Sequence, residues 1–177
     1  LSLLIFAAFQ ISIQNFRVEG SSMETTLQSG QYLLVNKLVY YRLDMERLAE
    51  KIPFIESTTG EIKYLFHAPQ RGEVVVFRYP LDTSRDFIKR IIAIPDDTVE
   101  LRDGIIYVND IALDDVSDPH KIRAFGERRL LGPDEYFVVG DNRVFSNDSR
   151  NWGPVVIDDI IGRAWITYWP FSELNVF

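Results

Sequence analysis

The sequence predicts a mainly β protein, built on an antiparallel β-sheet with a smaller β extension. Three observations predict this class: short runs of β-branched and aromatic residues, turn-forming residues between the runs, and little helical periodicity. Asp103 and Gly104 separate two of the runs, and this dipeptide favours the tight turn of a β-hairpin. The strand-like runs cover residues 31–39, 73–79, 86–94, 98–101, 105–108, 136–139 and 160–168.

The hairpin suggests how the chain is divided. We expect residues 15–97 and 133–177 to form the main β core and residues 98–132 to form a β-hairpin extension inserted into it. Away from the N-terminus, helical periodicity is confined to residues 44–51. At 177 residues, the chain has the length of one domain with room for a smaller subdomain.

The N-terminal stretch differs from the rest, because residues 1–16 carry no charge. A membrane-spanning helix needs about 20 apolar residues, so this stretch is slightly short. It lacks the basic start and small-residue cleavage site of a secretory signal. We therefore expect residues 1–14 to be the outer part of a transmembrane helix that is truncated at Leu1. A buried N-terminal helix or strand is the alternative.

Composition excludes several kinds of function. The net charge is −7 and Lys and Arg are not clustered, which argues against a nucleic-acid partner. The chain has no cysteine, so disulfides, thiolate nucleophiles and Cys-ligated zinc are excluded. The two histidines, His67 and His120, have no Glu or His at metal-ligand spacing. We expect no metal and no cofactor.

Three segments contain residues that ordinary strands and loops do not need. In the first, Ser22 follows Gly20 and Ser21, which a plain turn would also explain. In the second, Lys89 lies inside an apolar strand, where a lysine more often faces an edge or extends to solvent. The third, residues 140–153, collects small, charged and amide side chains between two apolar strands, and a hydrogen-bonded structural loop is the plainer interpretation.

The third segment also allows an arrangement that a structural loop does not require. If it is extended, Ser146, Asp148 and Arg150 share one face. The carboxylate and the guanidinium would then pair and leave a hydroxyl to orient another group. With no cysteine and two isolated histidines, a nucleophile would have to be Ser or Thr, and its base is most easily a lysine.

Together these motifs resemble those of the type I signal peptidases, the serine–lysine endopeptidases that remove signal peptides from exported proteins. The resemblance covers nearly the whole chain. It rests on the residues around Ser22-Met23, on residues 71–77, on residues 87–90 and on residues 140–153.

The resemblance implies that Ser22 is the nucleophile and Lys89 the general base. It implies that Ser146 positions the lysine, that Asp148 pairs with Arg150 and that Asp141 pairs with Arg90. The family's oxyanion hole uses the N–H of the nucleophile and a donor two residues earlier. That earlier residue is Gly20 here, so any donor there would be backbone or water.

The resemblance also implies the substrate. The family cuts after Ala-X-Ala in the signal peptides of secreted preproteins, at the surface of the cytoplasmic membrane and on its extracytoplasmic side. Met23, Leu27, Val18 and Phe87 would line the pocket before the scissile bond. Phe16, Leu33, Val76 and Ile88 would line the pocket two residues earlier. Four C-terminal aromatic residues could contact the bilayer or belong to the core: Trp165, Trp169, Phe171 and Phe177.

Two positions depart from the family pattern. Thr25 replaces a proline, and Asp96 replaces a glycine, which suggests a positive φ that Asp tolerates better than most residues. Apolar neighbours are expected to desolvate Lys89 and leave it largely neutral near pH 7–8. Two alternatives stay open: a LexA-like serine–lysine regulator that cleaves itself, and a catalytically weak membrane-anchored module that only binds peptides.

Overall fold

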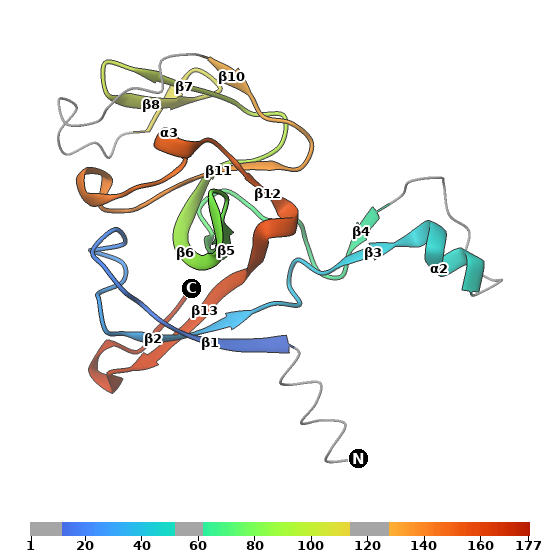
Figure 1. Cartoon of the computed structure of the whole chain (residues 1–177), viewed down its shortest axis with the longest axis horizontal. Coiled ribbons are helices and arrows are strands. Elements are labelled where there is room, and N and C mark those ends of the chain that lie inside the picture. The colour runs from blue at the N-terminus through green and yellow to red at the C-terminus, as the bar shows by residue number, and fades with distance from the viewer. Residues whose placement is uncertain (1–11, 52–61, 114–127) are drawn as a thin grey trace.

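The computed structural model describes residues 12–51, 62–113 and 128–177. Within them, eight strands form one antiparallel sheet, in the order β1-β2-β13-β5-β6-β11-β12, with β14 paired to β13 (Figure 1). These strands are β1 (Ile13–Arg17), β2 (Tyr32–Asn36), β5 (Val74–Tyr79), β6 (Asp82–Ala93), β11 (Glu135–Val139), β12 (Val155–Val156), β13 (Ile160–Trp169) and β14 (Asn175–Val176). The expectation of a mainly β protein with antiparallel sheets is confirmed.

The centre of this sheet explains the long apolar runs in the sequence. In β5, all four residues from Val74 to Phe77 are buried, because the strand is covered on both faces. In β6, the first half is exposed and the second half is buried. The register of the pair sets Val75 opposite Lys89. Lys89 therefore lies on β6 at the point where this strand enters the core.

A second, four-stranded sheet has the order β10-β7-β8-β9. Its strands are β7 (Thr98–Arg102), β8 (Ile105–Val108), β9 (Ile111–Ala112) and β10 (Arg129–Leu130). The hairpin predicted at Asp103-Gly104 is confirmed, and both residues have the positive φ of a primed turn. Side chains of this sheet share one hydrophobic cluster with Phe137 and Val139 of β11. The division of the chain at residues 98–132 stays a prediction.

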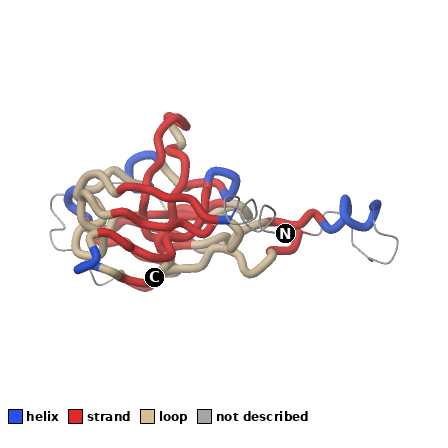
Figure 2. The backbone as a smooth tube through the Cα atoms, turned by 90° about the horizontal axis from the view of Figure 1, so that it is seen from below, coloured by secondary structure: helices blue, strands red, loops and turns tan. Residues whose placement is uncertain are grey.

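A two-stranded ribbon of β3 (Arg42–Asp44) and β4 (Ile62–Tyr64) carries helix α2 (Met45–Lys51). The expected helix at 44–51 is thus present, and the ribbon with α2 extends away from the main body (Figures 1 and 2). The remaining helical segments are short: η2 (Arg143–Phe145), α3 (Ser149–Trp152), η3 (Ile157–Asp159) and η4 (Phe171–Glu173).

The N-terminal expectation needs one correction. Residues 13 and 14 were assigned to the end of the membrane helix, but they lie in β1, which pairs with β2 from Ile13↔Asn36 to Arg17↔Tyr32. An anchor ending at residue 14 therefore overlaps a strand of the main sheet. Residues 1–11 lie outside the described residues. In the part of the chain that the structure describes, we find no helix with the length and apolar character needed to cross a membrane.

Candidate active site

The turn that carries Ser22 follows β1 and is held from below by apolar side chains. Gly20 opens the turn with a φ of +83°, a conformation that glycine adopts without strain. Met23 and Leu27 are each 1% exposed and pack in one cluster with Val18 and Leu33. The apolar anchors fix the backbone on both sides of Ser22 and leave its hydroxyl facing away from the core.

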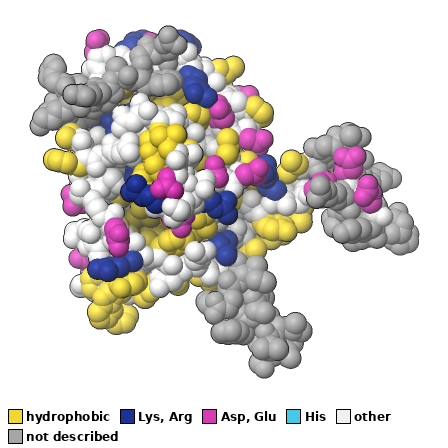
Figure 3. Space-filling view, in the orientation of Figure 1, with side chains coloured by type: hydrophobic (Ala, Val, Ile, Leu, Met, Phe, Trp, Pro, Cys, Tyr) yellow, Lys and Arg dark blue, Asp and Glu magenta, His cyan; other side chains and the backbone are white. Residues whose placement is uncertain are grey.

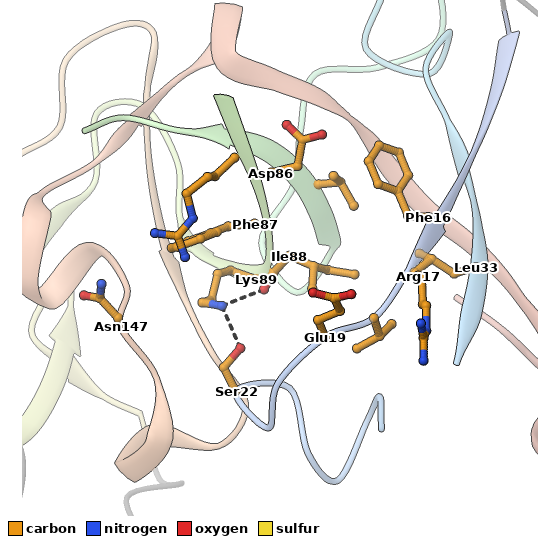
Figure 4. A pocket seen from close by; sticks show the side chains of 13 residues that line it. Phe16, Arg17, Glu19, Ser22, Leu33, Asp86, Phe87, Ile88, Lys89 and Asn147 are labelled. Atoms are coloured by element: carbon orange, nitrogen blue, oxygen red, sulfur yellow. Dashed lines mark hydrogen bonds between the residues drawn. The ribbon is translucent and has the colours of Figure 1, made fainter. Parts of the chain in front are cut away.

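Lys89, which lies on β6, is in contact with this hydroxyl. Its Nζ donates a 2.7 Å hydrogen bond to Ser22 Oγ and a 2.9 Å hydrogen bond to the carbonyl of Ile88 (Figure 4). The Lys89 side chain is buried, with 4% of the residue exposed, and its Nζ lies 5.3 Å from the centre of the Phe87 ring. Two residues that are 67 positions apart in the sequence thus form a serine–lysine pair.

The environment of Lys89 makes it a usable base. Burial is the largest influence and lowers the pKa of Lys89 to about 8; the charges of Asp148 and Asp141 act to raise it, and that of Arg150 acts to lower it. A pKa of about 8 leaves about half of the amine neutral at pH 8 and about a tenth at pH 7. The expected desolvation is confirmed, and the protonation state of the amine between pH 7 and pH 8 stays a prediction.

The segment after β11 holds the serine turn in place. The backbone N–H of Asn142 donates to the carbonyl of Ser22 at 3.0 Å, and its side-chain Nδ2 donates to the carbonyl of Ser21 at 3.1 Å. Gly140 permits the approach: a Cβ at this position would lie 2.4 Å from the Ser22 carbonyl oxygen and 2.3 Å from Ser146 Oγ. The absence of a side chain at residue 140 is therefore a steric requirement of the site.

Asp148 and Arg150 form a buried ion pair in the same segment. Asp148 is 0% exposed and accepts from Arg150 Nε and Nη2 at 2.7 Å each and from the Gly140 N–H at 3.0 Å. The backbone is extended at Ser146 and at Asp148, but it becomes helical at Ser149, so the alternation assumed from the sequence does not continue to Arg150. Asp148 instead caps the N-terminus of α3, where its side chain accepts from the backbone N–H of Arg150.

The second expected pair, Asp141 with Arg90, is also in contact. Asp141 accepts from Arg90 Nε at 2.8 Å, from Arg90 Nη2 at 2.6 Å and from Thr26 Oγ1 at 2.5 Å. Burial acts to raise the pKa of Asp141, but these hydrogen bonds and the Arg90 charge outweigh it and hold the pKa below the usual range. The pair connects β6 to the turn after Ser22.

Ser146 does not do what we expected of it. Its Oγ is buried and has no hydrogen-bond partner within the described residues, so it makes no bond to Lys89. Lys89 is instead held by Ser22 and its neighbouring carbonyl. The resemblance gave Ser146 this role, and its positioning of the lysine stays a prediction.

A groove of about 530 Å³ opens beside the serine–lysine pair. Six residues expected to bind substrate line it: Phe16, Val18, Leu33, Val76, Phe87 and Ile88. Met23 and Leu27 do not, because their side chains are used in the core beneath the turn. Sequence reasoning missed five lining residues with charged or amide side chains: Arg17, Glu19, Arg85, Asp86 and Asn147.

The two departures from the family pattern both have a positive φ, +64° at Thr25 and +67° at Asp96. The expectation for Asp96 is thus confirmed. The backbone N–H of Ser22 has no acceptor within the described residues, so it is available to a ligand. No group of three or more His, Cys, Asp or Glu side chains in the described ranges is arranged to hold a metal ion.

A serine hydroxyl bonded to a buried lysine amine beside a groove is the arrangement of the serine–lysine hydrolases, in which lysine replaces the histidine of the more familiar triad. Comparison with known proteins narrows this class. A sequence model of the family described as signal peptidase, peptidase S26, matches residues 1–169. The chain therefore belongs to this family of serine endopeptidases, which confirms the resemblance noted in the sequence.

Relatives found by sequence agree with this assignment. Over 174 residues, the chain is 33% identical to signal peptidase I of Bacillus caldolyticus, covering 90% of this chain and 81% of that protein. Over 128 residues, it is 37% identical to the chloroplastic thylakoidal processing peptidase 1 of Arabidopsis thaliana, covering 65% of this chain and 37% of that protein. A solved signal peptidase I from Enterococcus faecalis is 31% identical, with a TM-score of 0.43, covering 55% of this chain and 97% of that chain.

Proposed function

We propose that this chain removes signal peptides from exported preproteins at a membrane surface, with Ser22 as nucleophile and Lys89 as general base. One observation carries the proposal: the 2.7 Å hydrogen bond from Lys89 Nζ to Ser22 Oγ inside a water-poor site. A lysine with a pKa of about 8 can accept a proton near neutral pH, whereas an ordinary lysine cannot.

The proposed reaction has two steps. In the first, Lys89 takes the proton of Ser22 Oγ as the oxygen attacks the carbonyl carbon of the scissile bond. The Ser22 N–H donates to the resulting oxyanion, and the lysine ammonium gives its proton to the leaving amine. In the second, Lys89 deprotonates a water molecule that attacks the acyl-enzyme ester, and the proton returns to Ser22 Oγ.

The groove supports a preference for small residues before the scissile bond. Its floor is formed by Val18, Leu33 and Val76, all nearly inaccessible to solvent. Such a floor offers apolar contact to a methyl group and little depth for a larger side chain. We therefore extend the Ala-X-Ala preference of the family to this chain.

The groove also supports binding of an extended peptide. β11 pairs with β6 only through Arg90, Ile91 and Ala93. Within the described residues, the β6 segment from Asp82 to Lys89 thus has β5 on one side and no strand on the other. A signal peptide can add to this free edge as a strand, with main-chain hydrogen bonds that do not depend on its sequence.

The location at a membrane rests on an apolar surface. Hydrophobic side chains gather over the end of β13 and the turn that follows (Figure 3, lower left). Trp169, Phe171 and Leu174 are all exposed there, and Trp and Phe are favoured at a bilayer surface. We propose that this face contacts the bilayer and that an N-terminal anchor places the catalytic domain on the extracytoplasmic side of the cytoplasmic membrane.

The test is to incubate a preprotein with the wild-type chain and with the Ser22→Ala and Lys89→Ala variants, and to identify products by mass spectrometry. We expect one cut after a small residue with the wild type and none with either variant. Cleavage of the chain by itself in the absence of preprotein would indicate a LexA-like regulator. Binding of the preprotein without cleavage would indicate a peptide-binding module.

A further inference from the structure

The groove continues past the serine–lysine pair to a residue that the proposed mechanism does not use. Asn147 lines the same groove as Ser22 and Lys89, and among its described lining residues it alone comes from the segment between β11 and α3. It lies across Lys89 from Phe16 and Leu33 (Figure 4). The groove thus extends on both sides of the reacting groups, and both of its sides carry apolar and polar side chains.

Asn147 is held more firmly than its exposure suggests. Its neighbour on one side, Asp148, is fully buried in the ion pair with Arg150. Its side chain is exposed, but its Oδ1 accepts a 3.0 Å hydrogen bond from Nδ2 of Asn151, one helical turn further on. This bond fixes the carboxamide so that Oδ1 is occupied and Nδ2 has no acceptor within the described residues. The result is an oriented hydrogen-bond donor at one end of the groove.

The position of this donor identifies what it would bind. If Phe16 and Leu33 receive the residues before the scissile bond, as proposed, a peptide that passes Ser22 brings its leaving-group side to Asn147. An extended peptide advances about 3.3 Å per residue and presents a main-chain carbonyl at every residue. A single amide donor can hydrogen-bond such a carbonyl whatever side chain the substrate residue carries. This suits an enzyme whose products begin with many different sequences.

We infer that Asn147, oriented by Asn151, is a subsite for the main chain of the leaving-group side, and that it hydrogen-bonds a substrate carbonyl within the first residues after the scissile bond. This inference rests on the proposed function. Asn147 is therefore a specificity-determining residue: it distinguishes substrates that continue past the scissile bond from those that end there.

The test uses two substrates with the same sequence before the scissile bond. One continues as a peptide for five residues, and the other ends in a small chromogenic amine. Asn147→Ala should lower kcat/KM for the continued peptide about tenfold, the loss expected for one hydrogen bond worth about 1.4 kcal/mol. It should leave kcat/KM for the chromogenic substrate within about twofold. Asn151→Ala should cause a smaller loss in the same direction, because the donor remains but is no longer oriented.

The controls separate this inference from the proposed function. Asn175→Ala, at an exposed asparagine on β14, should change neither substrate. If the wild type cleaves both substrates and Asn147→Ala leaves the continued peptide unaffected, or slows both substrates equally, the subsite is wrong while the proposed function stands. If the wild type cleaves neither substrate, the proposed function fails and the subsite fails with it.

Discussion

The backbone N–H of Asn142 donates to the carbonyl oxygen of Ser22, and through this bond the segment after β11 and the turn after β1 form one unit. The amide plane that follows Ser22 is fixed by this contact, and the Asn142 side chain fixes the amide plane that precedes it through the Ser21 carbonyl. The Ser22 N–H, which belongs to the preceding plane, is thereby held in one orientation. A donor oriented before the substrate arrives requires no reorganisation during the reaction.

The close approach of these segments makes Gly140→Ala a sensitive test. The added Cβ would lie 2.4 Å from the Ser22 carbonyl oxygen, which cannot move without displacing the nucleophile. Because a displacement of about 1 Å can cost about a hundredfold in rate, we expect kcat on a preprotein peptide to fall by about that factor. The unfolding midpoint should fall as well.

Gly132→Ala is the matched control, because the atoms nearest to a Cβ at that position belong to the Glu135 side chain and lie at an ordinary contact distance of 3.6 Å. Its kcat should equal that of the wild type. Wild-type kcat in Gly140→Ala would show that the two segments separate without consequence, and that the contact does not position Ser22.

The pH dependence of cleavage should report the pKa of Lys89. The active form is the neutral amine, so kcat/KM should rise about tenfold per pH unit below pH 8 and level off above it. Since burial is the largest cause of the lowered pKa, Phe87→Ala should admit water and move the rising limb to higher pH. Loss of the ring's attraction for the ammonium acts in the opposite direction, but it is the smaller effect.

Phe66→Ala, at an exposed ring on the chain before β5, serves as the control and should leave the profile unchanged. A Phe87→Ala profile that coincides with that of the wild type would show that the Phe87 ring does not exclude water from Lys89.

The same lysine should reduce the stability of the fold. Its pKa is about 8 in the folded state and about 10.5 in the unfolded state, so the unfolded chain binds more protons between these values. Stability therefore rises as the pH increases from about 8 to about 10.5. Below pH 8 the buried lysine destabilises the folded state by its full amount. The difference of about 2.5 units between the two pKa values corresponds to about 3 kcal/mol.

Lys89→Met should consequently raise the free energy of unfolding at pH 7 by up to about 3 kcal/mol while abolishing cleavage. Urea denaturation at pH 7 and at pH 10.5 measures this, and the difference between variant and wild type should shrink at the higher pH. If Lys89→Met is less stable than the wild type at pH 7, the lysine contributes more through its contacts than it costs through burial.

Local signals in the sequence were enough to predict part of this structure. The Asp103-Gly104 hairpin was predictable because a primed turn needs positive φ at both residues, a requirement met within the dipeptide itself. Composition restricted the nucleophile to a Ser or Thr, and Ser22 and Lys89 in particular were proposed from the resemblance to the type I signal peptidases. Their contact depends on the pairing of β6 with β5 and on the turn after β1. No local sequence pattern specifies either of these.

Other features depend on tertiary context. β1 was only the alternative interpretation of its segment, because an uncharged apolar run suits both a membrane segment and a sheet, and only its pairing with β2 decides. Met23 and Leu27 were assigned to the groove by the resemblance, and the sequence alone does not show whether apolar residues beside a nucleophile face a ligand or the core. The helix at Ser149–Trp152 could have been found, because Asp148 is a favoured N-cap residue.

The residue that departs from the family pattern at position 25 gives a last prediction. Thr25 has a φ of +64°, whereas the proline of the family pattern holds φ near −65°. Thr25→Pro should therefore destabilise this chain, and Thr25→Gly should stabilise it by about 1 kcal/mol, since glycine accepts a left-handed conformation at no steric cost.

The effect of Thr25→Pro should reach activity through the next residue, because Thr26 Oγ1 donates to Asp141 and so joins the turn to Arg90. Urea denaturation of both variants measures stability, and kcat on a preprotein peptide measures the site. A Thr25→Pro chain as stable and as active as the wild type would show that the turn after Ser22 forms equally well with a negative φ, and that the left-handed conformation of Thr25 has no part in holding the nucleophile.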